Sequence, residues 1–232
     1  MSCAIMQPTY LPWSGYFNLM ASVDDFVFLD DVQFERRSWQ SRNRILLDGR
    51  EHLLSVPSVR ANREATIDVI EIDDSISWRE SHAKVLDAAY RKAPHGPDML
   101  AAVLPCIADR TLHLLVDLNI RIIEALSQLL FISTRLHRAS ALGCSGKRSE
   151  HLALICDHIG TNDYLSPLGS QYYLEKDNFS THHGKRLRLQ SFSPTPYAQR
   201  RANSFVSHLS VVDVISHLGL EGARNYVLGK TS

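Results

Sequence analysis

The first thirty residues constrain the fold most, because two apolar runs lie on either side of a turn and a short helical stretch. The run CAIM at residues 3–6 is followed closely by Pro8, which predicts a buried strand that leads into a loop. Residues 15–23 have the spacing of a short helix, and DFVFLD at residues 25–30 predicts a second strand. Strand, helix and strand in this order favour a parallel sheet with a right-handed crossover.

The rest of the chain continues to alternate between strand-like and helix-like segments. Further strands are expected at residues 53–56, 68–72, 163–166 and 186–190. Helices are expected at residues 77–92, 112–130, 147–159 and 210–217, the last one ending at Gly219. We therefore predict an α/β protein with a Rossmann-like parallel sheet. Residues 1–232 are expected to form one domain, with a mainly helical insertion at about 75–145.

Composition narrows the classes of function. Lys plus Arg equals Asp plus Glu at 25 each, so the chain has no global basic signature for nucleic acid or an anionic membrane. The N-terminus lacks a signal-peptide pattern and no long apolar run could span a membrane, so we expect a cytoplasmic protein. The four cysteines have no CxxC spacing, which argues against a disulfide framework and against a zinc site. The sequence requires no cofactor and is compatible with a homo-oligomer.

Three polar and aromatic segments follow predicted strands, at residues 6–17 (MQPTYLPWSGYF), 29–45 (LDDVQFERRSWQSRNRI) and 164–174 (YLSPLGSQYYL). Ligands of open parallel sheets bind at the carboxyl ends of strands, where such segments meet. Each has a plainer explanation, because aromatics often pack turns, paired aspartates cap helices and arginines form solvated surfaces. Together they favour a binding site. The substrate-binding residues expected are Gln7, Tyr10, Trp13, Gly15, Gln33, Arg37, Trp39, Arg42, Asn43, Arg44, Ser166, Gly169 and Ser170.

Three residues are candidates for proton transfer. Asp30 and Asp31 end the second predicted strand, and His82 lies one helical turn after Trp78, so that both share a face. A half-buried structural histidine is the alternative for His82. Gly169 and Ser170 could instead offer backbone N–H groups and a hydroxyl to an anion. No third ligand accompanies the adjacent histidines at 182–183, so no metal site is expected.

The same segments, together with PTPYAQ at 194–199 and FVSHLSVVDVISHLG at 205–219, resemble the successive signature blocks of the WbqC-like family. The resemblance covers nearly the whole chain. Members of that family occur in bacterial gene clusters for O-antigen and other surface polysaccharides, and in other biosynthetic clusters. The resemblance implies a biosynthetic enzyme, with glycine transfer to a sugar proposed for some members. It assigns no catalytic residue.

A more distant likeness concerns residues 13–16, WSGY, which lie where nucleotidylyltransferases carry their HxGH motif. The glycine is present, but aromatic residues replace both histidines. The likeness supports a nucleotidylyltransferase-like layout and argues against HxGH-type adenylyl transfer, because the imidazoles that would stabilise the transferring phosphate are missing.

Three classes of function follow. The first is a transferase that moves an aminoacyl or acyl group from a small-molecule or carrier-bound donor to an amine or sugar acceptor. The second is a nucleotide-dependent ligase or nucleotidyltransferase that activates a carboxylate. The third is a non-catalytic module that binds a nucleotide-sugar or a partner protein. The many convergent polar groups favour an enzyme.

Overall fold

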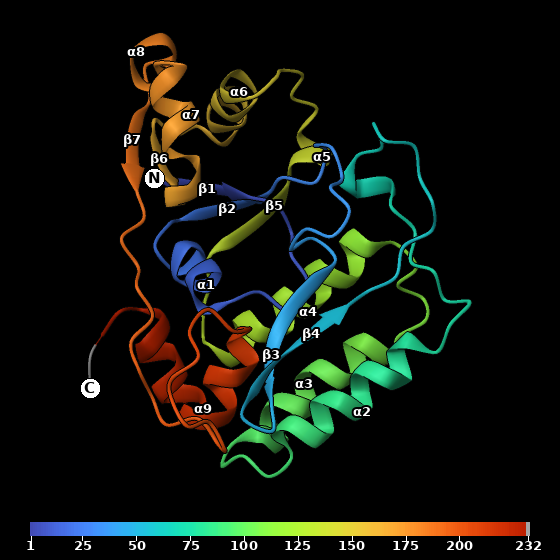
Figure 1. The fold of residues 1–232 in the computed structure, drawn as a ribbon. Helices are drawn as coiled ribbons and strands as arrows, with labels where there is room; N and C mark the ends of the chain where they lie inside the picture. The colour runs from blue at the N-terminus through green and yellow to red at the C-terminus, as the bar shows by residue number, and fades with distance from the viewer. Residues whose placement is uncertain (231–232) are drawn as a thin grey trace.

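The computed structural model describes residues 1–230 and shows an α/β protein built on a five-stranded parallel sheet (Figure 1). The strand order is β5-β2-β1-β6-β7. The strands are β1 (Cys3–Met6), β2 (Asp25–Phe28), β5 (Arg135–Arg138), β6 (Asp163–Ser166) and β7 (Arg186–Leu189). Every pairing between them is parallel. The predicted α/β class with a Rossmann-like sheet is confirmed.

The central strand β1 divides the interior into two hydrophobic layers, because successive side chains of a strand point to opposite faces. Ala4 faces the larger layer, which holds buried residues of α1 (Ser14–Ala21), α4 (Leu115–Leu129) and α9 (Val211–Val227). Cys3 and Ile5 face the smaller layer, against α6 (Ser149–Ile159), α7 (Gln171–Lys176) and α8 (Phe179–His183). The sheet is therefore covered on both faces, as a parallel sheet requires.

A long insertion separates β2 from β5. It contains the hairpin of β3 (Arg42–Leu47) and β4 (Arg50–Ser55), the short helix η1 (Ile67–Val69), and the helices α2 (Trp78–Tyr90) and α3 (Gly96–Ala108), and it ends with α4. The helices predicted near 77–92 and 112–130 are present. The helix α3 lies between them, inside the segment predicted to be mainly helical, although no bounds were predicted for it. Pro97 occupies one of its first two positions, where a missing N–H is tolerated.

The hairpin differs from the sequence-based expectation, which treated residues 42–47 as part of a polar loop. Asp48 and Gly49 both have positive φ, 49° and 76°, as the two central residues of a tight β-hairpin turn require. The Asp-Gly pair was the signal for this turn. Residues 68–72, expected as a strand, instead form a short 3-10 turn and isolated bridges, because residues 70–72 bond to the chain near Leu114.

The remaining helices are α5 (Ala139–Leu142) and the 3-10 helix η2 (Leu168–Ser170). The helix α6 ends at Gly160, which has the left-handed conformation that favours glycine at this position. The helix α9 begins after Ser210, whose side chain accepts a hydrogen bond from the N–H of Val212. Gly219 has φ 73° and ψ 179° and kinks this helix, which then continues to Val227.

The strand order locates the region where a ligand would bind. The chain passes from β1 to β2 and β5 on one side, then returns to β6 and β7 on the other side of β1. The order therefore reverses between β1 and β6, and loops that leave their carboxyl ends diverge there. Among the helices of residues 1–230, none is long and apolar enough to cross a bilayer.

Candidate functional site

A cavity of about 390 Å³ lies at the carboxyl ends of β1 and β6, where the strand order reverses. We call it the switch-point crevice. Its polar lining comes from the loops that follow β1, β2 and β6, namely Gln7, Thr9, Glu35, Ser38, Gln40 and Ser170. Its apolar floor includes Ile5, Leu29 and Leu152. A volume of this size is typical of small-molecule sites.

A second cavity of about 300 Å³ adjoins the crevice, and we call it the tryptophan pocket. It is lined by Met6, Thr9, Trp13, Trp39, Asn43, Arg44 and His208. Met6, Thr9 and Trp39 line both cavities. The two cavities therefore form one continuous site, referred to below as the joined site.

Hydrogen bonds fix the first two loops of the joined site to each other. The side-chain amide of Gln40 donates to Gln7 Oε1 at 2.9 Å, and the N–H of Tyr10 donates to the carbonyl of Trp39 at 3.1 Å. Asn43 Nδ2 donates to the carbonyls of Tyr10 and Leu11 at 3.1 and 2.9 Å. These bonds hold the loop after β1 against the start of β3, so the site is organised before any ligand binds.

Trp39 is the most exposed aromatic of the joined site, with 49% of its surface accessible. The guanidinium carbons of Arg42 and Arg44 lie 6.0 and 5.6 Å from its ring centroid. Arg44 also pairs with Glu51 at 3.0 Å, whereas Arg42 forms no ion pair within residues 1–230 and its Nε is buried without a partner. Arg42 is therefore a positive charge close to an exposed ring and available to an anion.

Trp13 forms the opposite wall of the tryptophan pocket. Its ring stacks on His208 with centroids 5.0 Å apart and meets Phe192 edge-on at 5.7 Å. A β-carbon at Gly15 would lie 2.1 Å from Trp13 Cζ2, so the missing side chain of Gly15 makes room for this indole. Gly15 was predicted to bind substrate, and the space beside it is filled by Trp13.

Three of the eight non-glycine residues with positive φ in the described part of the chain lie in loops around the joined site. Leu11, Arg37 and His208 have φ values of 45°, 61° and 57°, in the left-handed region that disfavours side chains. Each lies in a different loop, after β1, after β2 and before α9 respectively. Residues in such conformations gather at functional sites, because the surrounding structure must hold them there.

Asp30 lies outside the joined site and is fully buried. Its carboxylate accepts hydrogen bonds from Arg138 Nε, Ser140 Oγ and the N–H of Ser140 at 2.8, 2.8 and 2.9 Å. Arg138 also donates to Asp117 at 2.8 Å. A carboxylate with this set of partners anchors β5 to the loop after β2, and the geometry favours that structural role over the role of a free base.

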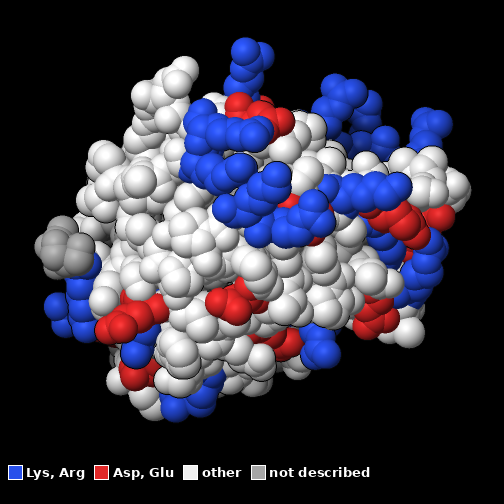
Figure 2. Space-filling view, turned by 90° about the horizontal axis from the view of Figure 1, so that it is seen from below, with Lys and Arg blue, Asp and Glu red and all other residues white. Residues whose placement is uncertain are grey.

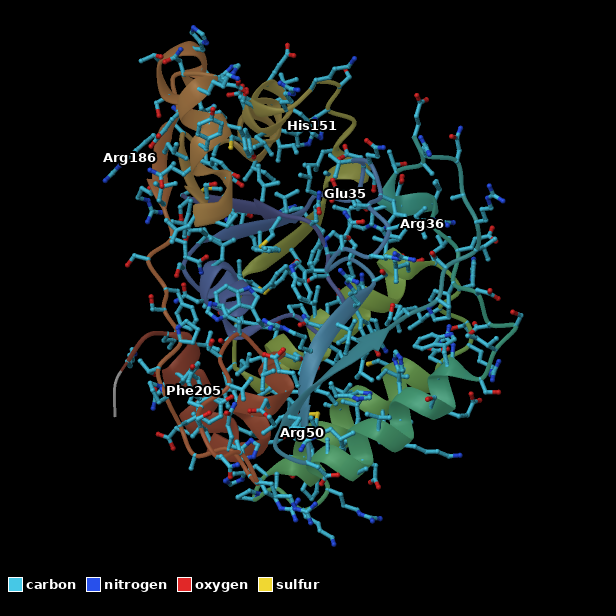
Figure 3. All side chains as sticks on the ribbon, viewed as in Figure 1. Glu35, Arg36, Arg50, His151, Arg186 and Phe205 are labelled. Atoms are coloured by element: carbon cyan, nitrogen blue, oxygen red, sulfur yellow. The ribbon has the colours of Figure 1, made fainter. Side chains whose placement is uncertain are left out.

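Asp31 faces α6 rather than the joined site. Its carboxylate oxygens lie 3.1 and 3.0 Å from Nε2 of His151, whose side chain is 7% exposed, and Nδ1 of this histidine has no partner within residues 1–230. Figure 3 places His151 on α6, near the loop that carries Glu35. The pair connects the loop after β2 to α6 beside the crevice wall formed by Leu152.

His82 lies in the larger hydrophobic layer. Its Nδ1 and Tyr10 Oη form a hydrogen bond of 2.9 Å, and Trp78 packs edge-on at 5.1 Å. Burial lowers the pKa of His82 to about 4, so the ring is neutral near pH 7. Burial likewise raises the pKa of Tyr10. These contacts favour the structural alternative for His82, and they place Tyr10 beneath the site rather than within it.

The structure brings six of the predicted binding residues together in the joined site, namely Gln7, Trp13, Trp39, Asn43, Arg44 and Ser170. Gln33 lines a separate cavity, and Arg37 is exposed. Ser166 is buried, with its hydroxyl directed to the carbonyl of Pro167 at 3.2 Å. Gly169 lies on the surface with no atom close to its missing β-carbon.

Several residues of the joined site were not predicted, namely Thr9, Glu35, Ser38, Gln40, Tyr173 and His208. Most of them lie inside the predicted segments. The sequence therefore identified the segments, but it did not identify which of their side chains line the cavities. His208 lies in the block at 205–219 and had no signal of its own beyond membership of that block. Within residues 1–230, no group of three His, Cys, Asp or Glu side chains is arranged to hold a metal ion.

Charge is distributed in patches rather than over the whole molecule. On the face seen in Figure 2, Lys and Arg side chains form a band in which Asp and Glu side chains are interspersed. This agrees with the equal numbers of acidic and basic residues in the chain. Any electrostatic selection of a ligand must therefore come from local groups such as Arg42.

The fold and its cavities define a parallel α/β protein with a candidate small-molecule site at the point where the strand order reverses. Residues 7–225 match the WbqC-like protein family, and the chain belongs to that family. It is also 28% identical over 221 residues to the uncharacterized protein Rv1507c of Mycobacterium tuberculosis (strain ATCC 25618 / H37Rv), with 94% of each chain covered. No solved structure matches the chain.

Proposed function

We propose that this protein is a biosynthetic transferase that moves an acyl or aminoacyl group, with glycyl as the first candidate, to the amine or hydroxyl of a sugar. The observation that carries this proposal is the joined site, where the crevice between β1 and β6 opens into a pocket walled by two tryptophans. Membership of the WbqC-like family supports a biosynthetic role.

The lining of the joined site suits a sugar. The exposed ring of Trp39 offers an apolar face against which the C–H groups of a pyranose can pack. Around it, Gln7, Thr9, Ser38 and Gln40 offer amide and hydroxyl groups that can both donate and accept hydrogen bonds. An acyl chain alone would not use so many polar groups.

Two titratable side chains of the joined site are suited to proton transfer. Glu35 is the one carboxylate among the described residues of the lining, and His208 is the one imidazole. An attacking amine or hydroxyl must lose a proton as it bonds to the acyl carbon, and a carboxylate or neutral imidazole can accept it. In this proposal Glu35 or His208 takes the role that the sequence suggested for Asp30, Asp31 or His82.

Arg42 and Arg44 supply the positive charge of the proposed site. Arg44 lines the tryptophan pocket, and Arg42 lies beside the same indole without a carboxylate partner among the described residues. A guanidinium of this kind can hold a carboxylate or phosphate of the donor or acceptor through two parallel hydrogen bonds.

Thermal-shift screening against amino sugars, nucleotide-sugars, amino acids and acyl thioesters tests the proposal. A ligand at about a hundred times its dissociation constant adds roughly 2.7 kcal/mol to stability, which raises Tm by roughly 5–10 °C for a chain of this size. Trp39→Ala should abolish the shift caused by sugars, whereas Tyr172→Ala, which removes an exposed aromatic elsewhere, should preserve it.

Activity assays distinguish the proposed transferase from a ligase and from a non-catalytic binding module. Glu35→Gln and His208→Gln should each be assayed for acyl transfer, and at least one should lower kcat without changing sugar affinity. Absence of any sugar-dependent shift would refute the proposal. Release of diphosphate from a nucleoside triphosphate would assign the protein to the ligase class instead.

A further inference from the structure

A third cavity, of about 830 Å³, lies next to the joined site and is lined by Gln33, Phe34, Glu35, Arg36, Arg60, Ala61, Asn62 and Arg63. We call it the arginine basin. We propose that the arginine basin binds the diphosphate of a nucleotide-linked sugar, so that the sugar end of this acceptor enters the switch-point crevice. The inference rests on the proposed function, because it names the form in which the sugar acceptor is presented.

The basin is built from two loops that hydrogen bonds hold in a fixed arrangement. The N–H of Phe34 donates to the carbonyl of Ala65 at 2.9 Å, and the N–H of Ile67 donates to the carbonyl of Val32 at 3.0 Å. Gln33 Nε2 donates to the carbonyl of Arg63 at 2.7 Å. The arginines therefore project from a preformed base, which reduces the ordering cost of binding.

The lining of the basin carries three arginines and one carboxylate, that of Glu35, so its formal charge is positive. Arg36, Arg60 and Arg63 are exposed, and none forms an ion pair within residues 1–230. Three guanidiniums around one cavity, in a chain of zero formal net charge, form a local concentration of positive charge. Planar guanidiniums bind phosphate oxygens through paired hydrogen bonds, and a diphosphate offers two such groups in succession.

The basin adjoins the switch-point crevice. Glu35 lines both cavities. Figure 3 shows Glu35 near the sheet edge and its neighbour Arg36 toward the segment that follows β4. A diphosphate held by the arginines would therefore direct its attached sugar past Glu35 toward Gln7 and Trp39.

The shape and lining of the basin favour a small anion over an acidic protein. Its volume falls within the range of small-molecule sites. The apolar lining consists of Phe34 and Ala61, and Phe34 is partly buried against the core, so the basin lacks the apolar anchor that a protein interface requires. A phosphate-bearing small molecule needs only the guanidiniums.

In this proposal the diphosphate contributes to binding and takes no part in the reaction. The sugar nitrogen or oxygen bonds to the carbonyl carbon of an activated acyl donor such as a thioester. The bond from that carbon to the leaving group breaks, and the leaving group departs with the proton that the sugar loses. Every bond to phosphorus stays intact, so no metal-assisted phosphoryl chemistry is needed.

Calorimetric titration with UDP, GDP and inorganic diphosphate tests the inference. Wild-type protein should bind at least one nucleoside diphosphate, and affinity should fall as salt concentration rises. The double variant Arg60→Gln/Arg63→Gln should weaken this binding at least tenfold. Arg186→Gln removes an exposed arginine at the far edge of the sheet that forms no ion pair within residues 1–230, and it should leave affinity within twofold of wild type.

Three results would overturn the inference: no diphosphate binding by wild-type protein, equal binding by the double variant with an unchanged Tm, or binding of an acidic carrier protein in place of nucleotides. Failure of the proposed function is distinguishable from these. Binding of UDP or GDP that depends on Arg60 and Arg63, with no acyl transfer to any nucleotide-sugar, would refute the transferase and retain the diphosphate site. Loss of sugar affinity in Trp39→Ala, with nucleotide affinity unaffected by the arginines, would refute only the inference.

Discussion

The indole of Trp13 occupies the space that a side chain at Gly15 would need, with Cζ2 only 2.1 Å from the position of a β-carbon there. The two residues are separated by a single position, yet this contact sets the wall of the tryptophan pocket. The glycine in the WSGY segment is therefore explained by packing within the protein, and its role can be tested without knowing the ligand.

Gly15→Ala should displace Trp13 from the pocket. Because the added methyl group would overlap a ring rather than a flexible chain end, we expect a loss of about 1–3 kcal/mol in unfolding free energy and a change in tryptophan fluorescence. Gly169→Ala is the matched control, since no atom lies near its missing β-carbon. Urea denaturation and emission spectra measure both effects, and equal stability of the two variants would contradict the assignment.

Asp30→Asn and Asp31→Asn should differ in their effects on stability. Asp30 is fully buried, and an asparagine there removes one of the two carboxylate partners of Arg138 and leaves donors of Ser140 without a full set of acceptors, so the replacement should cost about 1–3 kcal/mol. Asp31 is 21% exposed, and an asparagine oxygen can still accept the hydrogen bond from His151. Its replacement should therefore cost about 1 kcal/mol or less. Denaturant unfolding of both variants decides the question, and a larger loss for Asp31→Asn would show that its pairing with His151 is the main anchor.

His82 should make stability depend on pH in mildly acidic solution. Its pKa in the folded protein is about 4, below the value of about 6.5 expected in the unfolded chain. Between these two values the unfolded chain binds the proton that folded His82 excludes. Stability that is fully present above pH 6.5 is thus lost as pH falls toward 4, by about 3 kcal/mol in total.

The control for this prediction is His82→Gln, which retains a hydrogen-bonding group but cannot titrate. Unfolding free energies of both proteins should be measured by urea denaturation at several pH values between 4.5 and 7.5. The unfolding free energy is plotted against pH for each protein, and the difference between the two slopes gives the contribution of His82. Parallel curves would show that His82 binds its proton equally well in the folded state.

The four cysteines should differ in their reaction with a thiol reagent. Cys3 and Cys156 are buried with sulfur atoms 3.4 Å apart, and both their hydrogen bond and burial raise the pKa of Cys3. Cys144 is less buried, although burial and the nearby charge of Asp31 raise its pKa as well. Because the thiolate is the reactive form, native protein should react slowly and at Cys144 first. Mass spectrometry after limited alkylation identifies the site, and early modification of Cys3 would contradict the structure.

Much of the sheet could be predicted from the sequence, because its strands are short apolar runs bounded by turn residues. Residues 3–6 and 25–28 were found for that reason. The strand β3 was missed because Arg42, Asn43 and Arg44 make its first half polar, and the Asp-Gly turn that defines the hairpin was not used. Local composition alone favoured a loop there, whereas turn geometry favours a strand.

The candidate site was predictable as a set of segments but not as a set of side chains. Strand topology brings the loops after β1, β2 and β6 to one edge, which the sequence indicated. The direction of each side chain depends on partners far away in the chain: Arg138 for Asp30, across 108 residues, and Tyr10 for His82, across 72. Such partners are not visible in any local pattern, so the burial of Asp30 and His82 could not be predicted from the sequence.

The insertion between β2 and β5 has a consequence for folding during synthesis. Asp25 on β2 pairs with Arg135 on β5, which lies 110 residues later in the chain. When β2 is synthesised, its partner β1 already exists, whereas β5 does not. At a synthesis rate of about 5–20 residues per second, the wait lasts roughly 5–20 seconds. During that interval the edge of β2 offers unpaired backbone groups to any other extended chain. In the finished sheet β5 covers this edge, because Asp25–Phe28 pair in register with Arg135–Arg138.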